Sequence, residues 1–173
     1  MARIRIYGDP VLRKKALPVE KFDDTVRAFV DQMIQDMYDY DGVGLAAPQV
    51  GESLRVAIVD VTGGEQNPFV LINPEITWAS EELAESEEGC LSIPDINLKV
   101  KRPESVSVKA FNENGEEYTI SEATGLLARA LQHEIDHLNG ILFIDKISMV
   151  SRQMVSGKLK KLSKSRRDQA NVA

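Results

Sequence analysis

The sequence has little of what builds disulfide scaffolds and membrane spans. One cysteine among 173 residues excludes an intramolecular disulfide. No run approaches the roughly 20 apolar residues that a membrane-spanning helix requires, and the first residues lack the apolar segment of a secretory signal. A chain of this length buries roughly 70% of its unfolded surface without covalent staples. We therefore expect one soluble domain over residues 1–173, located in the cytoplasm, where a thiol stays reduced.

Histidine is also scarce, because the chain has only two. His133 and His137 frame the run H-E-I-D-H, which matches the pattern H-E-x-x-H. Positions i and i+4 lie on one face of a helix with Cβ atoms about 6 Å apart, so both imidazoles can bind one metal ion. Glu134, one step around the helix, can act as a general base on water. The motif predicts metal-assisted hydrolysis, although two ordinary histidines on a helix are the alternative.

A catalytic site of this type requires a third protein ligand. The extended pattern H-E-x-x-H-x-x-G-x-x-H continues through Gly140, but Phe143 stands where its third histidine should be. No glutamate follows Glu134, which excludes a set of two histidines and a downstream glutamate. The remaining soft ligand is Cys90, in the segment E-G-C-L-S-I-P. A lone cysteine is more often a small buried apolar residue, so its assignment rests on the need of the histidine pair for a partner.

The glycine and proline that flank Cys90 favour a short turn rather than a strand interior. A thiolate with two imidazoles suits zinc or another late divalent metal, and ferrous iron also accepts such a set. Two rival hypotheses stay open on the residues alone. One is a small metallopeptidase that cuts internal peptide bonds, and the other is a closed structural metal site completed by a carboxylate such as Asp145.

A third segment, residues 42–51, reads G-V-G-L-A-A-P-Q-V-G. Its glycines fit the end of a helix that runs into a buried turn. They do not account for Gln49, a single amide in an apolar run. A buried glutamine needs hydrogen-bond partners, so Gln49 is either structural or directed at a substrate.

Taken together, the segments G-V-G-L-A-A-P-Q-V, E-G-C-L-S-I-P and Q-H-E-I-D-H-L-N-G closely resemble the three signature motifs of the peptide deformylases. The resemblance covers most of residues 4–148. It implies hydrolysis of the N-formyl group from formyl-methionine at the start of new bacterial polypeptides. It also implies that Cys90, His133 and His137 are the metal ligands and that Glu134 is the general acid and base.

The resemblance further implies a set of substrate contacts. Gln49 would donate its side-chain amide, and Leu91 its backbone N–H, to the oxyanion that forms on the formyl oxygen. Gly44 and Gly89 would offer backbone groups to the substrate peptide. The methionine side chain would enter an apolar pocket near Val43, Leu91, Leu126 and Ala130.

The resemblance also indicates which metals to expect, and the sequence departs from the family pattern at one place. The family commonly uses Fe²⁺ in cells, and Zn²⁺, Ni²⁺ or Co²⁺ are expected in purified protein. Some members carry an arginine shortly after S-I-P that helps to hold the substrate. This chain reads D-I-N-L at residues 95–98 instead, which leaves the anchoring of the substrate backbone open.

The charge is distributed unevenly. Residues 151–173 hold seven basic side chains and one acidic, a net charge of +6, so the rest of the chain carries −12. Val155, Leu159 and Leu162 follow helical spacing, which predicts an amphipathic C-terminal helix within residues 148–173 that ends in a frayed tail. The basic face of this helix is either solvated or a contact for the ribosome and its rRNA. Similar basic helices of bacterial deformylases make the ribosome contact. We expect no DNA or membrane partner.

The remaining patterns predict an α+β fold, with antiparallel or mixed β-sheets wrapped around the central metal-binding helix and with an N-terminal helix. We expect the N-terminal helix from Asp23 or Asp24 to about Tyr40, and the central helix between Thr124 and Gly140. Strands are predicted at residues 54–61, 69–76, 98–101, 105–111 and 116–120. The acidic run over residues 81–88 is expected to be solvated, with Glu88 paired to Arg102.

Overall fold

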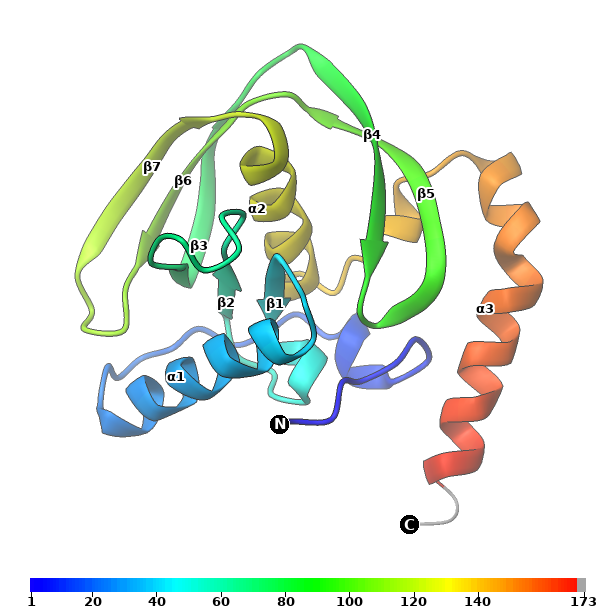
Figure 1. The fold of residues 1–173 in the computed structure, drawn as a ribbon, viewed down its shortest axis with the longest axis horizontal. Coiled ribbons are helices and arrows are strands. Elements are labelled where there is room, and N and C mark those ends of the chain that lie inside the picture. Colours follow the sequence, from blue (N-terminus) through cyan, green and yellow to red (C-terminus); the bar gives the residue numbers. More distant parts are fainter. Residues whose placement is uncertain (171–173) are drawn as a thin grey trace.

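The computed structural model describes the backbone of residues 1–170 and the side chains of residues 1–166. It shows three α-helices and two antiparallel sheets, one of five strands in the order β1-β2-β3-β6-β7 and one of two strands, β4-β5. Helix α2 lies between the two sheets (Figure 1). This arrangement confirms the expected α+β fold. The predicted frayed end, residues 171–173, lies outside the described residues.

The elements have the following bounds. The helices are α1 (Asp24–Asp39), α2 (Gly125–Leu138) and α3 (Met149–Ala170), and short 3-10 turns occur at Pro10–Arg13, Ala47–Val50 and Phe143–Asp145. The strands are β1 (Gly44–Ala46), β2 (Val56–Val59), β3 (Phe69–Ala79), β4 (Leu83–Cys90), β5 (Ile93–Pro103), β6 (Val106–Phe111) and β7 (Glu117–Ala123).

Helix α1 begins as the sequence predicts. The Asp23 carboxylate accepts a hydrogen bond from Val26 N at 3.1 Å, which satisfies one of the free N–H groups of the first turn. Val30, Met33 and Met37 form the buried face of α1. They pack with side chains of β1 and β2, so α1 covers one side of the five-stranded sheet.

The β4–β5 hairpin differs most from expectation. The acidic side chains of residues 81–87 are exposed, as expected, but residues 83–90 form strand β4, which was not predicted, and β5 is much longer than residues 98–101. The register places Glu85 opposite Lys101 and Glu87 opposite Lys99, and cross-strand pairs of opposite charge favour a sheet. The run is therefore a strand although its exposed side chains are acidic.

Helix α2 is the buried centre of the fold. Leu131, Ile135 and Leu138 pack among residues of the five-stranded sheet. Thr124 precedes the helix as expected, but its side chain makes no capping hydrogen bond. Gly140 follows the helix with φ +73°, and a Cβ there would lie 2.6 Å from a backbone oxygen of residue 13. Glycine is required there because the neighbouring chain passes so closely.

Helix α3 docks on the β4–β5 hairpin (Figure 1). Val155 and Leu159 are buried in a cluster with Ile93 and Val100 of β5, and Leu162 packs against it. This confirms the predicted amphipathic helix, since Lys158, Lys160, Lys161 and Lys164 are all exposed. None of the described helices is long and apolar enough to cross a membrane.

Candidate metal centre

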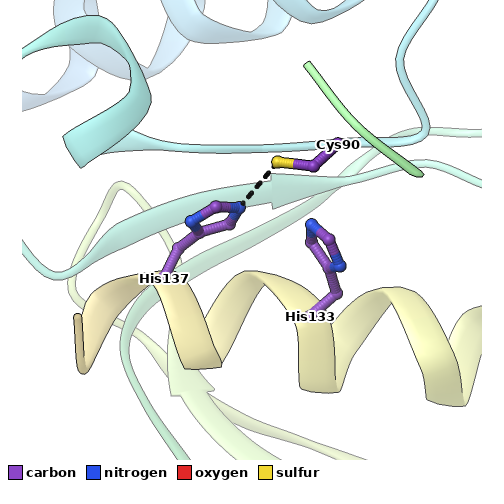
Figure 2. Close-up of side chains that lie close together, drawn as sticks. All are labelled: Cys90, His133 and His137. Carbon is purple, nitrogen blue, oxygen red and sulfur yellow. Dashed lines mark hydrogen bonds between the residues drawn. The ribbon is translucent and has the colours of Figure 1, made fainter. Parts of the chain in front are cut away.

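The fold brings Cys90, His133 and His137 together. Cys90 is the last residue of β4, next to the tight turn that the sequence predicts, and the two histidines occupy successive turns of α2. Their ligand atoms lie within 4.8 Å of one another, and Cys90 Sγ is 3.3 Å from His137 Nε2. Figure 2 shows the three side chains converging on one point between the hairpin and the helix.

Glu88 fixes the orientation of His133. Its Oε2 lies 3.0 Å from His133 Nδ1, and a carboxylate can only accept, so Nδ1 carries the hydrogen. This leaves Nε2 of His133 for a metal ion, an arrangement common among metal-binding histidines. Burial opposes ionisation of Glu88, but hydrogen bonds from His133 and Arg102 outweigh it and hold its pKa well below the usual range.

A buried network of charges holds Glu88 in place. Arg102 donates to both Glu88 oxygens, at 2.5 and 3.0 Å, which confirms the pair that the sequence predicts. Arg129 donates to Glu88 Oε1 at 2.8 Å, and Arg102 also donates to Asp136 at 2.7 Å. The sequence analysis missed Arg129 and Asp136. Arg129 precedes His133 by four residues on α2 and Asp136 lies between the two histidines, and this closeness in sequence was the only available signal.

Two buried polar atoms lack a partner among the described residues, namely His137 Nδ1 and Glu134 Oε2. Burial lowers the pKa of His137 well below its ordinary value, with the positive neighbours adding to the effect. A neutral imidazole is the form that binds metal. The Nε2 atom of this neutral ring lies 3.3 Å from Cys90 Sγ and, with the thiol and the second imidazole, gives a donor set that fits a divalent ion preferring nitrogen and sulfur ligands.

Glu134 is buried beside the proposed ligands, with 4% of its surface exposed. Burial raises the pKa of Glu134 to about 7. A cation held by the neighbouring ligands would stabilise the ionised form. Burial and a bound cation thus act on the pKa of this carboxyl in opposite directions.

Gln49 is buried with a fixed orientation. Its Oε1 accepts a hydrogen bond from Ala46 N at 2.9 Å, so its amide nitrogen must point the other way. That nitrogen lies 3.2 Å from Ser92 Oγ and 3.5 Å from Cys90 Sγ. The amide N–H groups thus face the metal centre, while the oxygen has a structural role.

A cavity of about 430 Å³ opens beside the metal centre. It is lined by every expected site residue except His137: Val43, Gly44, Gln49, Gly89, Cys90, Leu91, Leu126, Ala130, His133 and Glu134. Val43 and Leu126 are 46% and 54% exposed, which places them at its opening, whereas Ala130 is buried. Glu87, Pro94, Asp95 and Arg129 also line the cavity, although the sequence analysis did not assign them to the site.

A helix that presents H-E-x-x-H to a cysteine at the end of a neighbouring hairpin, beside an open cavity, defines a metallohydrolase. The family model described as polypeptide deformylase matches residues 1–153. The chain therefore belongs to the polypeptide deformylase family, metal-dependent hydrolases that remove the N-formyl group from nascent polypeptides. A peptidase that cuts internal bonds is not favoured.

Individual relatives agree with this assignment. The chain is 51% identical over 159 residues to a peptide deformylase of Thermotoga sp. (strain RQ2), covering 92% of this chain and 94% of the relative. It is 49% identical over 163 residues to that of Brucella suis, covering 93% of each. The crystal structure of a peptide deformylase from Legionella pneumophila is similar with a TM-score of 0.88 at 45% identity, covering 98% of both chains. A plant peptide deformylase matches with a TM-score of 0.94 at 38% identity, over 98% of this chain and 93% of its own.

Replacing Gly44 with alanine is expected to lower kcat about 100-fold, the cost of misplacing a reacting group by about 1 Å. A Cβ at Gly44 would overlap Glu134 Oε1 and lie 2.9 Å from Cγ of the same side chain. Because Glu134 is buried, its carboxylate cannot move aside into water. Steady-state kinetics with a formyl-peptide measure the change.

Gly157→Ala is the matched control, since a Cβ there meets nothing within 4 Å. It should leave kcat unchanged and stabilise α3 by about 0.5–1 kcal/mol. Wild-type kcat in Gly44→Ala would contradict the close packing described here.

Proposed function

We propose that this chain removes the formyl group from formyl-methionine of nascent polypeptides with one divalent metal ion, Fe²⁺ in cells, held by Cys90, His133 and His137. The observation that carries the proposal is the convergence of these ligand atoms within 4.8 Å beside a buried carboxylate. When bound there, the ion supplies Lewis acidity, which acidifies water and polarises the formyl carbonyl. Zn²⁺, Ni²⁺ or Co²⁺ in purified protein would be compatible with the same donors.

Glu134 moves the proton in this proposal. Its Oε2 has no protein partner among the described residues, so it is free to accept a proton from the attacking water. The same oxygen then delivers that proton to the amine nitrogen as the carbon–nitrogen bond breaks. Formate and a free N-terminal amine are the products, and Glu134 returns to its ionised form.

Gln49 and Leu91 stabilise the negative charge that develops on the formyl oxygen. The buried amide of Gln49 is held by Ala46 N, so its donors need no reorganisation during the reaction. Leu91 follows Cys90 directly and lines the same cavity, where its backbone N–H is the second proposed donor. Loss of one such donor costs about 3 kcal/mol in comparable sites.

The cavity binds the substrate. Val43, Leu126 and Ala130 provide an apolar lining for the methionine side chain, and Gly44 and Gly89 let the peptide backbone approach β1 and β4. Glycine suits such positions because it adds no side chain between the two backbones. The apolar walls also exclude water from the reacting group.

Anaerobic purification with metal analysis, followed by assay of formate release from formyl-Met-Ala-Ser, tests the proposal. We expect one equivalent of metal per chain and turnover that is lost after chelation and restored by Fe²⁺. Absence of formate release with Fe²⁺, Ni²⁺ and Co²⁺ would overturn the function. Cleavage of an internal peptide bond instead would favour the rival peptidase activity.

We also propose that the enzyme works in the cytoplasm at the ribosome, with α3 in contact with rRNA. The support is the row of exposed lysines on the outer face of α3, since phosphates attract such a stripe in a salt-dependent way. Lys158→Glu, Lys161→Glu and Lys164→Glu together are expected to abolish co-sedimentation with ribosomes. The buried face of α3 is untouched, so deformylation of a short peptide should stay at the wild-type level.

The control variant replaces three exposed lysines that are far from α3 in the sequence, at positions 14, 15 and 21, with glutamate. This variant has the same net charge change and should still sediment with ribosomes. If the α3 variant binds as the wild type does, the ribosome contact is wrong.

A further inference from the structure

A second cavity lies away from the metal centre, between α1, the start of β3 and the tip of the β6–β7 hairpin. Its volume is about 450 Å³, which is within the range of small-molecule sites. Figure 1 shows the β6–β7 hairpin and the β4–β5 hairpin on opposite sides of α2. Among the described residues, none lines both this cavity and the substrate cavity. A ligand bound here would therefore leave the substrate cavity open.

Most of the lining is apolar. Ile34 of α1, Pro68 and Phe69 at the start of β3 and the ring of Tyr118 from β7 all line the cavity, and all four side chains are half-buried. Apolar and aromatic walls of this kind bind the body of a small ligand. The faces of phenylalanine and tyrosine rings also attract cations.

Glu113 gives this apolar cavity a negative charge. Among the described residues that line the cavity, it is the charged one. Its side chain is half-buried, yet it takes part in no hydrogen bond or ion pair with any described residue. Lys109, the basic residue of the β6–β7 hairpin, is paired with Glu117 instead. Because partial burial of an unpaired carboxylate is unfavourable, a cation that entered the cavity would find a partner in Glu113.

The carboxylate of Glu113 lies close to the aromatic wall. Burial raises the pKa of Tyr118, and the negative charge of Glu113 raises it further. The two side chains are therefore near enough for their charges to interact. A ligand that places a cation beside Glu113 would bring the rest of its body against the ring of Tyr118.

The walls of the cavity are tied to one another. The Tyr118 hydroxyl donates to Val70 O at 2.5 Å, which joins β7 to β3. Tyr38 of α1 donates to Asp60 at 2.6 Å, which joins α1 to the segment that leads into β3. Asn112 Oδ1 accepts two backbone N–H groups of its own turn, both at 3.0 Å, and so fixes the turn that carries the carboxylate. A preformed cavity of this kind loses little freedom when a ligand binds.

We propose that this cavity is a second ligand site, which binds an ammonium or guanidinium group carried on a small apolar or aromatic body. Glu113 pairs with the cation, and Ile34, Phe69 and Tyr118 cover the body. An anion would be repelled by the same carboxylate. The cation can belong to a small amine or to a basic side chain of a bound peptide, since both present the same chemistry to the cavity.

The test titrates the Zn²⁺-loaded full-length protein with three probes of similar shape and different charge, namely phenethylamine, phenethyl alcohol and phenylacetate. Excess Met-Ala-Ser keeps the substrate cavity occupied. We expect the NMR amide signals of Asn67 and Glu113 to shift, with a Kd on the order of 1 mM for the amine. The amine should bind about fivefold more tightly than the alcohol, and phenylacetate should bind more weakly than the alcohol.

A fourth probe distinguishes the two sources of the cation. Acetyl-Phe-Arg-amide carries an aromatic ring and a guanidinium group on a peptide. Tighter binding of this peptide than of phenethylamine would identify a basic side chain as the natural ligand. The reverse order would identify a small amine, and both orders support the site.

Variants test which residues carry the preference. Glu113→Gln should bring the amine and the alcohol to equal affinity without weakening the alcohol, whereas Ile34→Ala should weaken both probes alike. Glu65→Gln is the matched control, since Glu65 is exposed two residues before Asn67 and does not line the cavity, and it should keep the preference. Equal affinities in the wild type, a preference that persists in Glu113→Gln, or shifts confined to the substrate cavity would overturn the site.

Discussion

Glu134→Gln is expected to lower kcat by about 1,000-fold or more while leaving the metal content at one equivalent per chain. The amide keeps the size of the carboxylate but cannot take a proton from water or return it to the departing amine, and general acid–base catalysis contributes up to about 10⁴-fold. The residue is not among the three proposed ligands, so metal binding should survive. Formate release and metal analysis on the same sample measure both quantities.

The same chemical change at Glu82, which is exposed and does not line the cavity, provides the control and should leave kcat unaltered. Turnover of Glu134→Gln within a few-fold of wild type would show that another group carries the proton. Loss of the metal would instead mean that Glu134 supports the ligands.

The second large effect is expected from Glu88→Ala. Removing this carboxylate leaves Arg129 without its buried ionic partner and Arg102 with only Asp136, a type of change that costs about 3–5 kcal/mol. His133 also loses the acceptor of its Nδ1 hydrogen, and loss of such a partner weakens metal affinity about 10–100-fold. Denaturant unfolding of the metal-free protein measures the first effect, and competition with a chelator measures the second.

Glu117→Ala is the control for the unfolding experiment. It breaks an exposed ion pair with Lys109, 3.7 Å apart, and should cost less than about 1 kcal/mol. An equally small cost for Glu88→Ala would mean that the buried network contributes little to stability.

The stability difference between wild type and Glu88→Ala should also depend on pH. The folded protein holds the pKa of Glu88 below its ordinary value of 4.5. The unfolded chain therefore takes up the proton first as the pH falls. The contribution of Glu88 is fully present above its ordinary pKa and is lost as the pH falls below that value towards the folded pKa. Unfolding of both proteins between pH 7 and pH 3 would show the difference shrinking on the acid side.

The parts of the site that follow a local spacing rule could be predicted from the sequence. Two histidines four residues apart specify a helix face, and the absence of other ligands directs attention to Cys90. Gln49 was recognisable because an amide in an apolar run needs partners. These arguments depend on residues that are close in the sequence, or on the small number of possible metal ligands in the chain. They do not depend on the tertiary fold.

The parts that were missed depend on contacts between distant segments. The composition of the acidic run correctly predicts that its side chains are solvated, but only the pairing of Glu85 with Lys101 across the hairpin shows why the run is a strand. Arg129 contacts Glu88 across 41 positions of sequence, and no local pattern connects the two.

The position of Cys90 has a consequence for the whole molecule. The cysteine packs against the apolar cluster that Val155 and Leu159 of α3 complete, and its sulfur faces His137 of α2. A metal ion would therefore act as a cross-link that ties the hairpin to the central helix, and α3 would clamp the same hairpin from its other face. Coupling free energies are reciprocal. Whatever stabilises the docking of α3 should therefore raise the affinity for the ion, and a filled metal centre should in turn stabilise the docking of α3 by the same free energy.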